Sequence, residues 1–386
     1  MRQNVQELPP LSLYVHLPWC VRKCPYCDFN SHRAGEHAPY RRYTDVLLQD
    51  IASEGARARG RQVVSVFLGG GTPSLFEPSL IVRVLDACRN ELDLAADCEI
   101  TMEANPGTVE HGSLGAYAAA GVSRLSIGAQ SFNEQALRAL GRIHGPGEIH
   151  AAYEEAKRAG FASINLDLMF ALPGQTLDTA RADVSEAIAL SPAHISYYQL
   201  TLEPNTVFHQ KPPDGIPGDE LVWEMQIDGQ RRLVDAGYAQ YEVSAFAKED
   251  HRCRHNLNYW EFGDYLAVGA GAHGKFTYPD GRVARYRKNA NPLAYMERLE
   301  RGQARPDDDE LGRDDLRFEF MLNALRLTGG FRKDLFAERT GLDPADLAGP
   351  VSEAVAAGLL LETDERWQPT ADGLRFLNDL QARFLP

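Results

Sequence analysis

The 386-residue sequence lacks a long hydrophobic run, and no stretch of about 18 apolar residues is present that could span a membrane as a helix. Residues 1–15 also lack the basic and then apolar segments of a secretory signal. Basic residues are the minority, since 40 Lys and Arg stand against 54 Asp and Glu and give a formal net charge of −14. Because a chain must neutralise phosphates to bind nucleic acid, we expect no nucleic-acid partner.

Cysteine is scarce as well, and six residues in this length are too few for a disulfide framework. A reduced, cytoplasmic protein is therefore expected, while peripheral contact with a membrane is left open by composition. Three of the six lie within eight residues, at Cys20, Cys24 and Cys27, and Cys88, Cys98 and Cys253 are scattered. Clustered cysteines in a reducing compartment indicate metal or redox chemistry.

Strand-like and helix-like segments alternate over the first two thirds of the chain. The expected strands are Leu11–His16, Val63–Leu68, Cys98–Glu103, Ser123–Gly128, Ser163–Phe170, His194–Thr201 and Tyr241–Phe246. The amphipathic stretches between them are Tyr40–Ala58, Pro78–Leu92, Gly147–Gly160, Leu177–Leu190 and Asp219–Gly237. This alternation predicts an α/β fold with a mostly parallel sheet and right-handed crossovers. Periodicity alone does not distinguish an open sheet from a barrel.

The C-terminal region does not continue this alternation of strands and helices. Apolar residues recur at helical spacing at Phe318, Met321, Leu322 and Leu325. Helices near Arg332–Thr340 and over Asp343–Gly358 follow, and then a predicted hairpin at 359–369 and a last helix, Ala371–Phe384. Helices followed by a short hairpin predict a winged-helix-like domain. Since the segment is not basic, we interpret it as a packing or lid module and not as a reader of DNA grooves.

The spacing Cys20-x3-Cys24-x2-Cys27 follows the first expected strand and lets three thiolates converge on one metal centre. One interpretation is a zinc knuckle, for which His16, Asp28 or His32 would supply the fourth ligand. The other is an iron–sulfur cluster held by three thiolates, with one iron open to a further ligand.

The wider context favours the cluster. The segment from Tyr14 to Asn30 resembles the signature of the radical S-adenosylmethionine (SAM) superfamily, and within it the oxygen-independent coproporphyrinogen III oxidase-like family. The resemblance continues through Gly69-Gly-Gly-Thr-Pro73, Glu103-Ala-Asn-Pro-Gly-Thr108, Arg124–Phe132, Leu140–His144 and Asn165–Gln175. Six motifs in this order are far more specific than one glycine-rich turn.

The resemblance implies a partial (β/α)6 TIM-like barrel and a [4Fe–4S] cluster on Cys20, Cys24 and Cys27, whose fourth iron is chelated by SAM. The SAM-binding positions it implies are Tyr14, Tyr26, Gly70, Gly71, Thr72, Glu103, Gln130, Arg142, Asp167 and Thr201. Glycines would let the backbone approach SAM closely, and strand-end carboxylates and amides would face it at the carboxyl end of the barrel. The expected domains are a radical SAM barrel over 1–245, a connecting segment over 246–306 and the C-terminal domain over 307–386.

Two features separate this sequence from the dehydrogenases of that family. Phe29 stands where they carry a fourth cysteine, and only ten residues precede the first expected strand. The segment His255-Asn-Leu-Asn-Tyr259-Trp260 resembles instead the mark of the family's haem chaperones. His255, Tyr259 and Trp260 are therefore candidate haem residues, with Cys253 or His273 as other ligands, although a turn and a packed core would explain the same residues.

These observations predict a haem chaperone that binds a cluster, SAM and haem. Its expected partners are haem, acceptor haemoproteins such as those of a respiratory chain, and an electron donor for the cluster. The alternative is a radical SAM oxidoreductase of porphyrin biosynthesis, or, less favoured, radical SAM chemistry on an unrelated substrate. Porphyrinogen decarboxylation is disfavoured, and no catalytic residue is assigned. Arg282, Arg285, Arg287 and Lys288 are expected to form a basic, solvated face.

Overall fold

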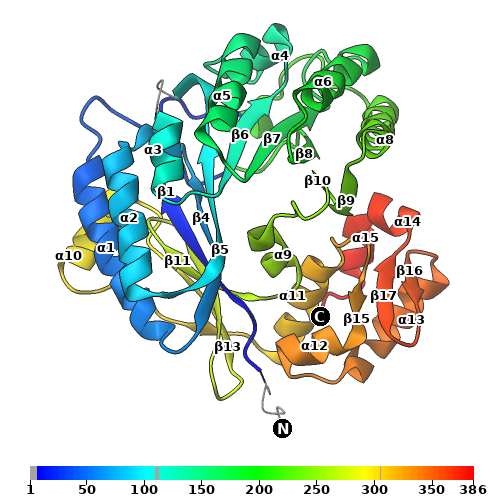
Figure 1. The fold of residues 1–386 in the computed structure, drawn as a ribbon. Coiled ribbons are helices and arrows are strands. Elements are labelled where there is room, and N and C mark those ends of the chain that lie inside the picture. The colour runs from blue at the N-terminus through cyan, green and yellow to red at the C-terminus, as the bar shows by residue number, and fades with distance from the viewer. Residues whose placement is uncertain (1–6, 109–112, 305) are drawn as a thin grey trace.

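The computed structural model describes residues 7–108, 113–304 and 306–386. Six parallel strands form the centre of the sheet in chain order (Figure 1). They are β1 (Leu11–Leu17), β4 (Gln62–Gly70), β5 (Asp93–Ala104), β6 (Arg124–Gln130), β7 (Ser163–Phe170) and β8 (His194–Gln199). The predicted partial (β/α)6 barrel is thus confirmed.

Strand β1 shows how the sequence orients the sheet. Leu11, Leu13 and Val15 belong to the large apolar core. The residues between them alternate to the barrel interior, where Ser12 hydrogen-bonds Ser65 of β4 and Tyr14 hydrogen-bonds His16. The apolar faces pack on the outer helices (Figure 1), which are α1 (Tyr40–Arg57), α2 (Pro78–Glu91), α3 (Ser113–Ala119), α5 (Pro146–Ala159), α6 (Leu177–Leu190) and α8 (Asp219–Asp235). The barrel interior is consequently polar. In the described ranges, no helix is both long and apolar enough to cross a bilayer.

The segment 246–306, expected as a connecting segment, contains strands of the main sheet. It adds β11 (Asp264–Val268), parallel to β1, and then β12 (His273–Thr277) and β13 (Val283–Arg287), to the same sheet. Each of these strands is only five residues long, and β11 pairs with β1 across some 250 residues, so local pattern does not reveal them. The single strand expected at Tyr241–Phe246 is instead an antiparallel pair, β9 (Ala239–Glu242) and β10 (Ala245–Ala247).

The C-terminal region has its own apolar core, and it combines helices with a small antiparallel sheet, as the winged-helix-like prediction expects. Phe320, Phe336 and Trp367 pack together there. The elements are α11 (Arg313–Ala324), β15 (Phe331–Arg332), α12 (Lys333–Thr340), α13 (Ala348–Ala356), β16 (Leu360–Glu362), β17 (Arg366–Pro369), α14 (Ala371–Arg375) and α15 (Leu377–Ala382). The expected last helix is divided at Phe376, whose backbone leaves helical angles.

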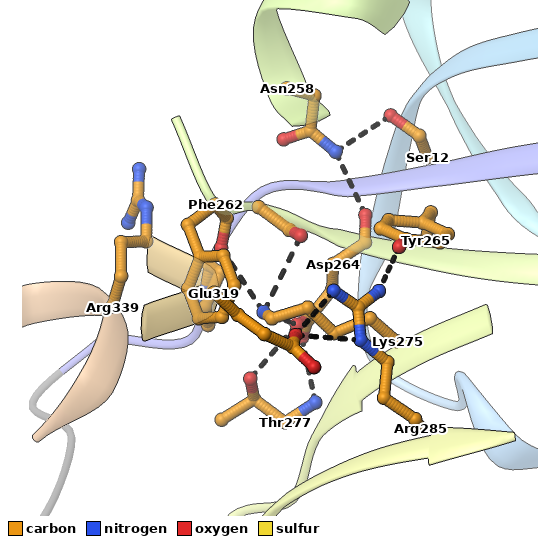
Figure 2. Close-up of polar contacts among 12 residues, drawn as sticks. Ser12, Asn258, Phe262, Asp264, Tyr265, Lys275, Thr277, Arg285, Glu319 and Arg339 are labelled. Atoms are coloured by element: carbon orange, nitrogen blue, oxygen red, sulfur yellow. Dashed lines mark hydrogen bonds and ion pairs between the residues drawn. The ribbon is translucent and has the colours of Figure 1, made fainter. Parts of the chain in front are cut away.

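One buried ion pair lies within the main sheet, and a partly exposed pair connects that sheet to the C-terminal domain (Figure 2). Asp264 accepts hydrogen bonds from the Lys275 ammonium at 2.9 Å and from the Thr277 backbone at 2.9 Å, and both ionic side chains are fully buried. Removing one member of this buried pair leaves the other charge uncompensated, which costs about 3–5 kcal/mol of folding free energy. Arg285 of β13 pairs with Glu319 of α11 across the boundary between the two regions.

The expected basic, solvated face is wrong for two of its four members. Lys288 is buried and contacts Asp50 at 2.6 Å and Glu54 at 2.8 Å, and Arg285 is engaged as described. Only Arg282 and Arg287 are exposed. The partners of the buried cations come from α1 and α11, which the local sequence does not indicate.

Candidate functional site

A cavity of about 440 Å³ opens where the parallel strands end. This is the edge at which parallel barrels carry their ligands, and the volume lies in the range of small-molecule sites. Cysteines, a glycine-rich turn and polar strand-end residues surround it. The lining includes Cys20, Cys24, Tyr26, Cys27, Gly70, Gly71, Thr72, Glu103, Gln130, Arg142, Asp167 and Thr201.

Of the three clustered cysteines, Cys20 ends β2 (Trp19–Cys20), and Cys24 and Cys27 lie on the loop between β2 and β3 (His32–Arg33). They are half-buried free thiols that line the cavity, and a turn with the Cys27 N–H donating to the Cys24 carbonyl at 3.1 Å brings two of them together. Burial raises the pKa of the Cys20 and Cys27 thiols. In the described part of the chain no set of three His, Cys, Asp or Glu side chains is placed to hold a single metal ion.

Asn30 fixes the end of the cysteine loop, a role that the sequence did not indicate. Its side-chain amide donates to the carbonyls of Ala270, at 2.9 Å, and Ala290, at 2.8 Å. Its own carbonyl lies 2.9 Å from His16 Nε2. Since a carbonyl can only accept, His16 carries its proton on Nε2, and Nδ1 accepts from the Tyr14 hydroxyl at 3.0 Å.

The glycine-rich turn needs glycine for its contacts within the protein. Gly70 has φ +104°, and a Cβ there would lie 2.2 Å from the His16 ring. Its N–H donates to Glu103 Oε2 at 2.9 Å. The N–H groups of Gly71 and Thr72 donate to the carbonyls of Leu17 and Trp19. With these N–H groups engaged, this turn can meet a polar ligand through carbonyl oxygens.

Two strand-end side chains are held in fixed orientations. Gln130 follows an irregularity in the β6–β7 register, has φ +67° and accepts a hydrogen bond from the Tyr198 hydroxyl at 2.8 Å. Asp167 accepts from Ser126 and from the Asn165 amide, each at 2.9 Å. Strained backbone of this kind is often found at ligand sites.

Glu103 and Arg142 supply opposite charges to the cavity wall. Burial, opposed by the Gly70 hydrogen bond and reinforced by nearby Asp167, raises the pKa of Glu103 to about 7. Arg142 donates to the Cys24 sulfur at 3.6 Å and to the Gly128 carbonyl at 2.8 Å. Its buried Nε has no hydrogen-bond partner among the described residues, so the cavity offers an unused donor to an anionic group.

Tyr14 is the one predicted SAM position that does not line the cavity. Strand alternation places it in the barrel interior, where it stacks on Phe67 and hydrogen-bonds His16. Tyr26 and Thr201 both reach the lining, and Tyr26 also packs against Phe208.

The candidate haem residues lie at the opposite end of the barrel, on α9 (Arg254–Trp260). His255 is 2 % exposed, contacts Ser65 Oγ through Nδ1 at 3.0 Å and stacks on Phe67. Burial lowers its pKa to about 3. Tyr259 packs edge-on to His255 and Tyr265, and Arg326 lies over the ring of Trp260, 4.3 Å from its centroid. Figure 1 shows α9 between the barrel strands and the C-terminal domain.

The other ligand candidates are dispersed. Cys253 is buried beside Glu99, and burial raises its pKa to about 12. His273 is exposed at the start of β12. Of the residues considered for zinc, Asp28 lines the cavity and His16 and His32 do not.

Several cavity residues were not among the predicted site residues. Arg22, Asn105, Ser126 and Met169 lie within the quoted motifs but were given no role, and Tyr198 and Glu203 lie outside them. Ser126 and Tyr198 lie beside predicted site residues on neighbouring strands, since Ser126 donates to Asp167 and Tyr198 donates to Gln130.

Comparison with known proteins agrees with this geometry. Residues 14–187 match the Radical SAM superfamily and residues 311–376 the HemN C-terminal domain. A protein of Escherichia coli K12 named haem chaperone HemW is 48% identical over 98% of this chain and 99% of its own length. The protein of the same name from Haemophilus influenzae is 45% identical over 98% and 99%. The solved structure of E. coli coproporphyrinogen III oxidase (HemN), described as a radical SAM enzyme, superposes with TM-score 0.82 at 25% identity, covering 99% of this chain and 92% of that one.

Proposed function

Since this chain belongs to the HemW family of the radical SAM superfamily, we propose that it is a haem chaperone that binds haem and transfers it to acceptor haemoproteins. The observation that carries this proposal is similarity along almost the whole of both chains, including the segment that holds α9. A short shared motif would support the fold alone, whereas full-length similarity supports a shared activity.

We propose that Cys20, Cys24 and Cys27 hold a [4Fe–4S] cluster and that the adjoining cavity binds SAM. The donor set fits these groups, because thiolates are the ligands that iron–sulfur clusters take, and Arg142 lines the cavity with a buried Nε that has no hydrogen-bond partner among the described residues. When both are bound, the cluster supplies the electron for reductive cleavage of SAM.

The chain's own residues then divide the binding work. Arg142 can pair with a carboxylate, Glu103 can accept from a cationic amine, and the glycine-rich turn offers carbonyl oxygens. Gln130 and Asp167 are fixed by Tyr198, Ser126 and Asn165, so that their free lone pairs keep one orientation. Tyr14 does not contact the cavity itself: its hydroxyl holds the His16 ring, which in turn donates to the backbone carbonyl of Asn30 at the end of the cysteine loop.

The second candidate is a porphyrin-synthesising oxidoreductase of the coproporphyrinogen dehydrogenase type. The fold of HemN supports it, with TM-score 0.82. Phe29 weighs against it, because this side chain lines the cavity and is 57% exposed at the position of the dehydrogenases' fourth cysteine.

The proposal extends to location and partners. A cytoplasmic protein of this kind needs an electron donor for its cluster and haemoproteins, such as respiratory-chain components, as acceptors. Contact of haem with His255, Tyr259 and Trp260 stays a prediction, and it requires α9 to move, because His255 is buried in the closed barrel.

The deciding experiment compares haem binding with porphyrinogen conversion. The anaerobically reconstituted protein is titrated with haemin, and transfer to an apo-haemoprotein is followed by absorbance. The same preparation is incubated with SAM, a reductant and coproporphyrinogen III. Stoichiometric haem binding and transfer without protoporphyrinogen support the chaperone. Formation of protoporphyrinogen, or absence of haem binding, overturns it.

A further inference from the structure

Helix α9, which carries the candidate haem residues, is covered from outside by the C-terminal domain. Its Leu257 and Trp260 pack against the apolar core of that domain. From α12, Arg339 Nε donates at 3.2 Å to the carbonyl of Glu261, the residue that caps the end of α9. The inner face of the helix meets the barrel strands through the hydrogen bonds described above. Helix α9 is therefore held from two sides, by the barrel and by the C-terminal domain.

Arg326 of the C-terminal domain fastens the end of α9 through its side chain. It follows α11, and its guanidinium carbon lies 4.3 Å from the centroid of the Trp260 ring. The same guanidinium donates to Glu242 Oε2 of β9 at 3.0 Å, and Glu242 is buried. A guanidinium that stacks on a ring and pairs with a buried carboxylate has a fixed position. Arg326 thus joins α9, β9 and the C-terminal domain.

The residue at the exit of α9 has a strained backbone. Phe262 has φ +55°, an angle that bulky side chains rarely adopt. Its buried ring packs edge-on to Phe320 of α11, with centroids 5.7 Å apart, and Lys275 Nζ lies 4.2 Å from its centroid (Figure 2). Strained backbone persists only where its surroundings hold it. The contact with α11 therefore helps to keep α9 in place.

The position of α9 over the barrel leaves two of its polar atoms unsatisfied. His255 Nε2 and Trp260 Nε1 are buried without a hydrogen-bond partner among the described residues. Such burial costs free energy, because each nitrogen has lost water and gained no replacement. Movement of α9 away from the barrel returns both nitrogens to water or to a ligand. The contacts with the C-terminal domain offset this cost while the helix stays in place.

We propose that the C-terminal domain is a latch on α9, meaning that its contacts keep the helix over the amino end of the barrel, and that Arg326 holds this latch closed. The inference rests on the proposed function and specifies how the haem residues become accessible. When the Arg326 contacts are released, α9 moves away from the barrel, and His255 and Trp260 become available to haem. If only the open state binds haem, the apparent affinity is lowered by the fraction of open molecules. Weakening the latch therefore strengthens haem binding, whereas loss of a haem contact weakens it.

Cys253 gives a direct measure of opening, because it caps the start of α9 and is 3% exposed. Its labelling by a thiol reagent is followed by peptide mass spectrometry on the full-length, cluster-reconstituted protein without haem. Cys88 of α2 is fully buried and reports global unfolding in the same sample. The variants are Arg326→Ala, Arg326→Lys and the matched control Arg375→Ala. The Arg375 guanidinium also lies 4.3 Å from a tryptophan centroid, that of Trp223 on α8.

We expect Arg326→Ala to raise the labelling rate of Cys253 about five- to tenfold, since this rate follows the population of the open state. The labelling of Cys88 should not change, and Arg375→Ala should leave both rates at their wild-type values. Arg326→Lys keeps a charge for Glu242 but loses the flat guanidinium, so it should raise the rate by a smaller factor. Should Arg326→Ala not fold, Arg326→Lys makes the same test.

Haemin affinity is then measured by absorbance for the same proteins, and Arg326→Ala should bind haemin about fivefold more tightly than wild type. Unchanged labelling of Cys253, or equal increases at Cys253 and Cys88, overturns the latch. Equal or weaker haemin binding by a variant whose Cys253 has become reactive overturns it as well. If wild type binds no haemin, it is the chaperone function that fails, and the labelling of Cys253 still decides whether the latch exists.

Discussion

Polar side chains line the barrel interior at both of its ends, but one end is an open cavity and the other is covered by α9. At the carboxyl end, Glu103, Gln130, Asp167 and Arg142 surround an open cavity. At the amino end, α9 enters between the strands, and His255 and its neighbours contact groups that the barrel itself provides.

The difference lies in what covers the polar groups. Asn258 of α9 donates to Ser12 and to the Asp264 carbonyl at 2.9 and 2.8 Å, so α9 is fastened over the amino end by hydrogen bonds. Two buried atoms of α9, His255 Nε2 and Trp260 Nε1, still have no hydrogen-bond partner among the described residues. At the carboxyl end Arg142 Nε likewise has no partner and burial raises the pKa of Glu103 to about 7, but both residues line an open cavity. Polar groups that line a cavity can meet a ligand directly, whereas those beneath α9 cannot while the helix stays in place.

The largest expected effect is at the open end. Cys20→Ala should abolish incorporation of iron and sulfide, because two thiolates cannot retain the cluster that three hold. Iron and sulfide per chain are measured after anaerobic reconstitution. Cys98→Ala, a half-buried thiol outside the cavity, is the control. Full iron content in Cys20→Ala would show that Cys20 is not needed to hold the cluster.

At the closed end, His255→Ala should lower the free energy of unfolding by about 2–3 kcal/mol, since it leaves a void against Phe67 and removes one of the hydrogen-bond partners of Ser65. Urea unfolding measures this change. The exposed His150→Ala should stay within about 0.5 kcal/mol of wild type. An unaltered urea midpoint for His255→Ala would show that α9 does not stabilise the barrel.

The same histidine makes stability depend on pH. Burial lowers the pKa of His255 to about 3 and that of His16 to about 4, against about 6.5 in the unfolded chain. Each depressed pKa gives stability that is present above pH 6.5 and is lost as the pH falls towards the folded value. Between pH 6 and 4, His255→Gln should reduce the slope of unfolding free energy against pH by about 1.4 kcal/mol per unit. Equal slopes in the two proteins contradict this assignment.

Glu103 gives the opposite sign at the open end. Its pKa is raised to about 7 from 4.5, so the stability it contributes is present below pH 4.5 and is lost as the pH rises through 7. Glu103→Gln should therefore stabilise the cofactor-free protein at pH 8 by about 1 kcal/mol, a figure discounted for solvent at the cavity mouth. SAM affinity, measured by calorimetry, should fall in this variant and lose its rise between pH 6 and 8. Stronger SAM binding by Glu103→Gln would exclude the proposed contact.

The smallest effect is expected at Phe29. Because this side chain is 57% exposed, Phe29→Ala should change stability by less than about 0.5 kcal/mol and leave iron content unaltered. Melting temperature and iron analysis test both. Loss of iron would give the position a structural role in the cluster site.

Sequence periodicity predicted the six parallel strands well, and Ser163–Phe170 has the same bounds as β7. Runs of this kind are buried on the outer face and bounded by turns, so local pattern suffices. Strands β11 to β13 were missed because β11 is specified by its pairing with β1, and β12 and β13 by the strands beside them, contacts that are remote or too short to leave a local pattern.

In the candidate site, too, residues placed by local sequence were predicted and residues placed by remote contacts were not. Residues within motifs, such as Glu103 and Asp167, lie at the strand ends where the pattern placed them. Tyr14 was assigned to the ligand by resemblance, but alternation along β1 turns it towards Phe67. Asn30 could not be inferred, since its partners Ala270 and Ala290 are more than 200 residues away.

The contacts of Asn30 have a consequence for biosynthesis. Its side chain donates to the carbonyls of Ala270 and Ala290. Ala270 comes just after β11, one of the two strands that pair with β1. The cysteine loop is translated early, yet the groups that fasten it are among the last of the barrel to leave the ribosome. We therefore expect metal loading to follow release of the barrel from the ribosome, and nascent chains that stop before residue 290 to expose their three thiols without a settled loop.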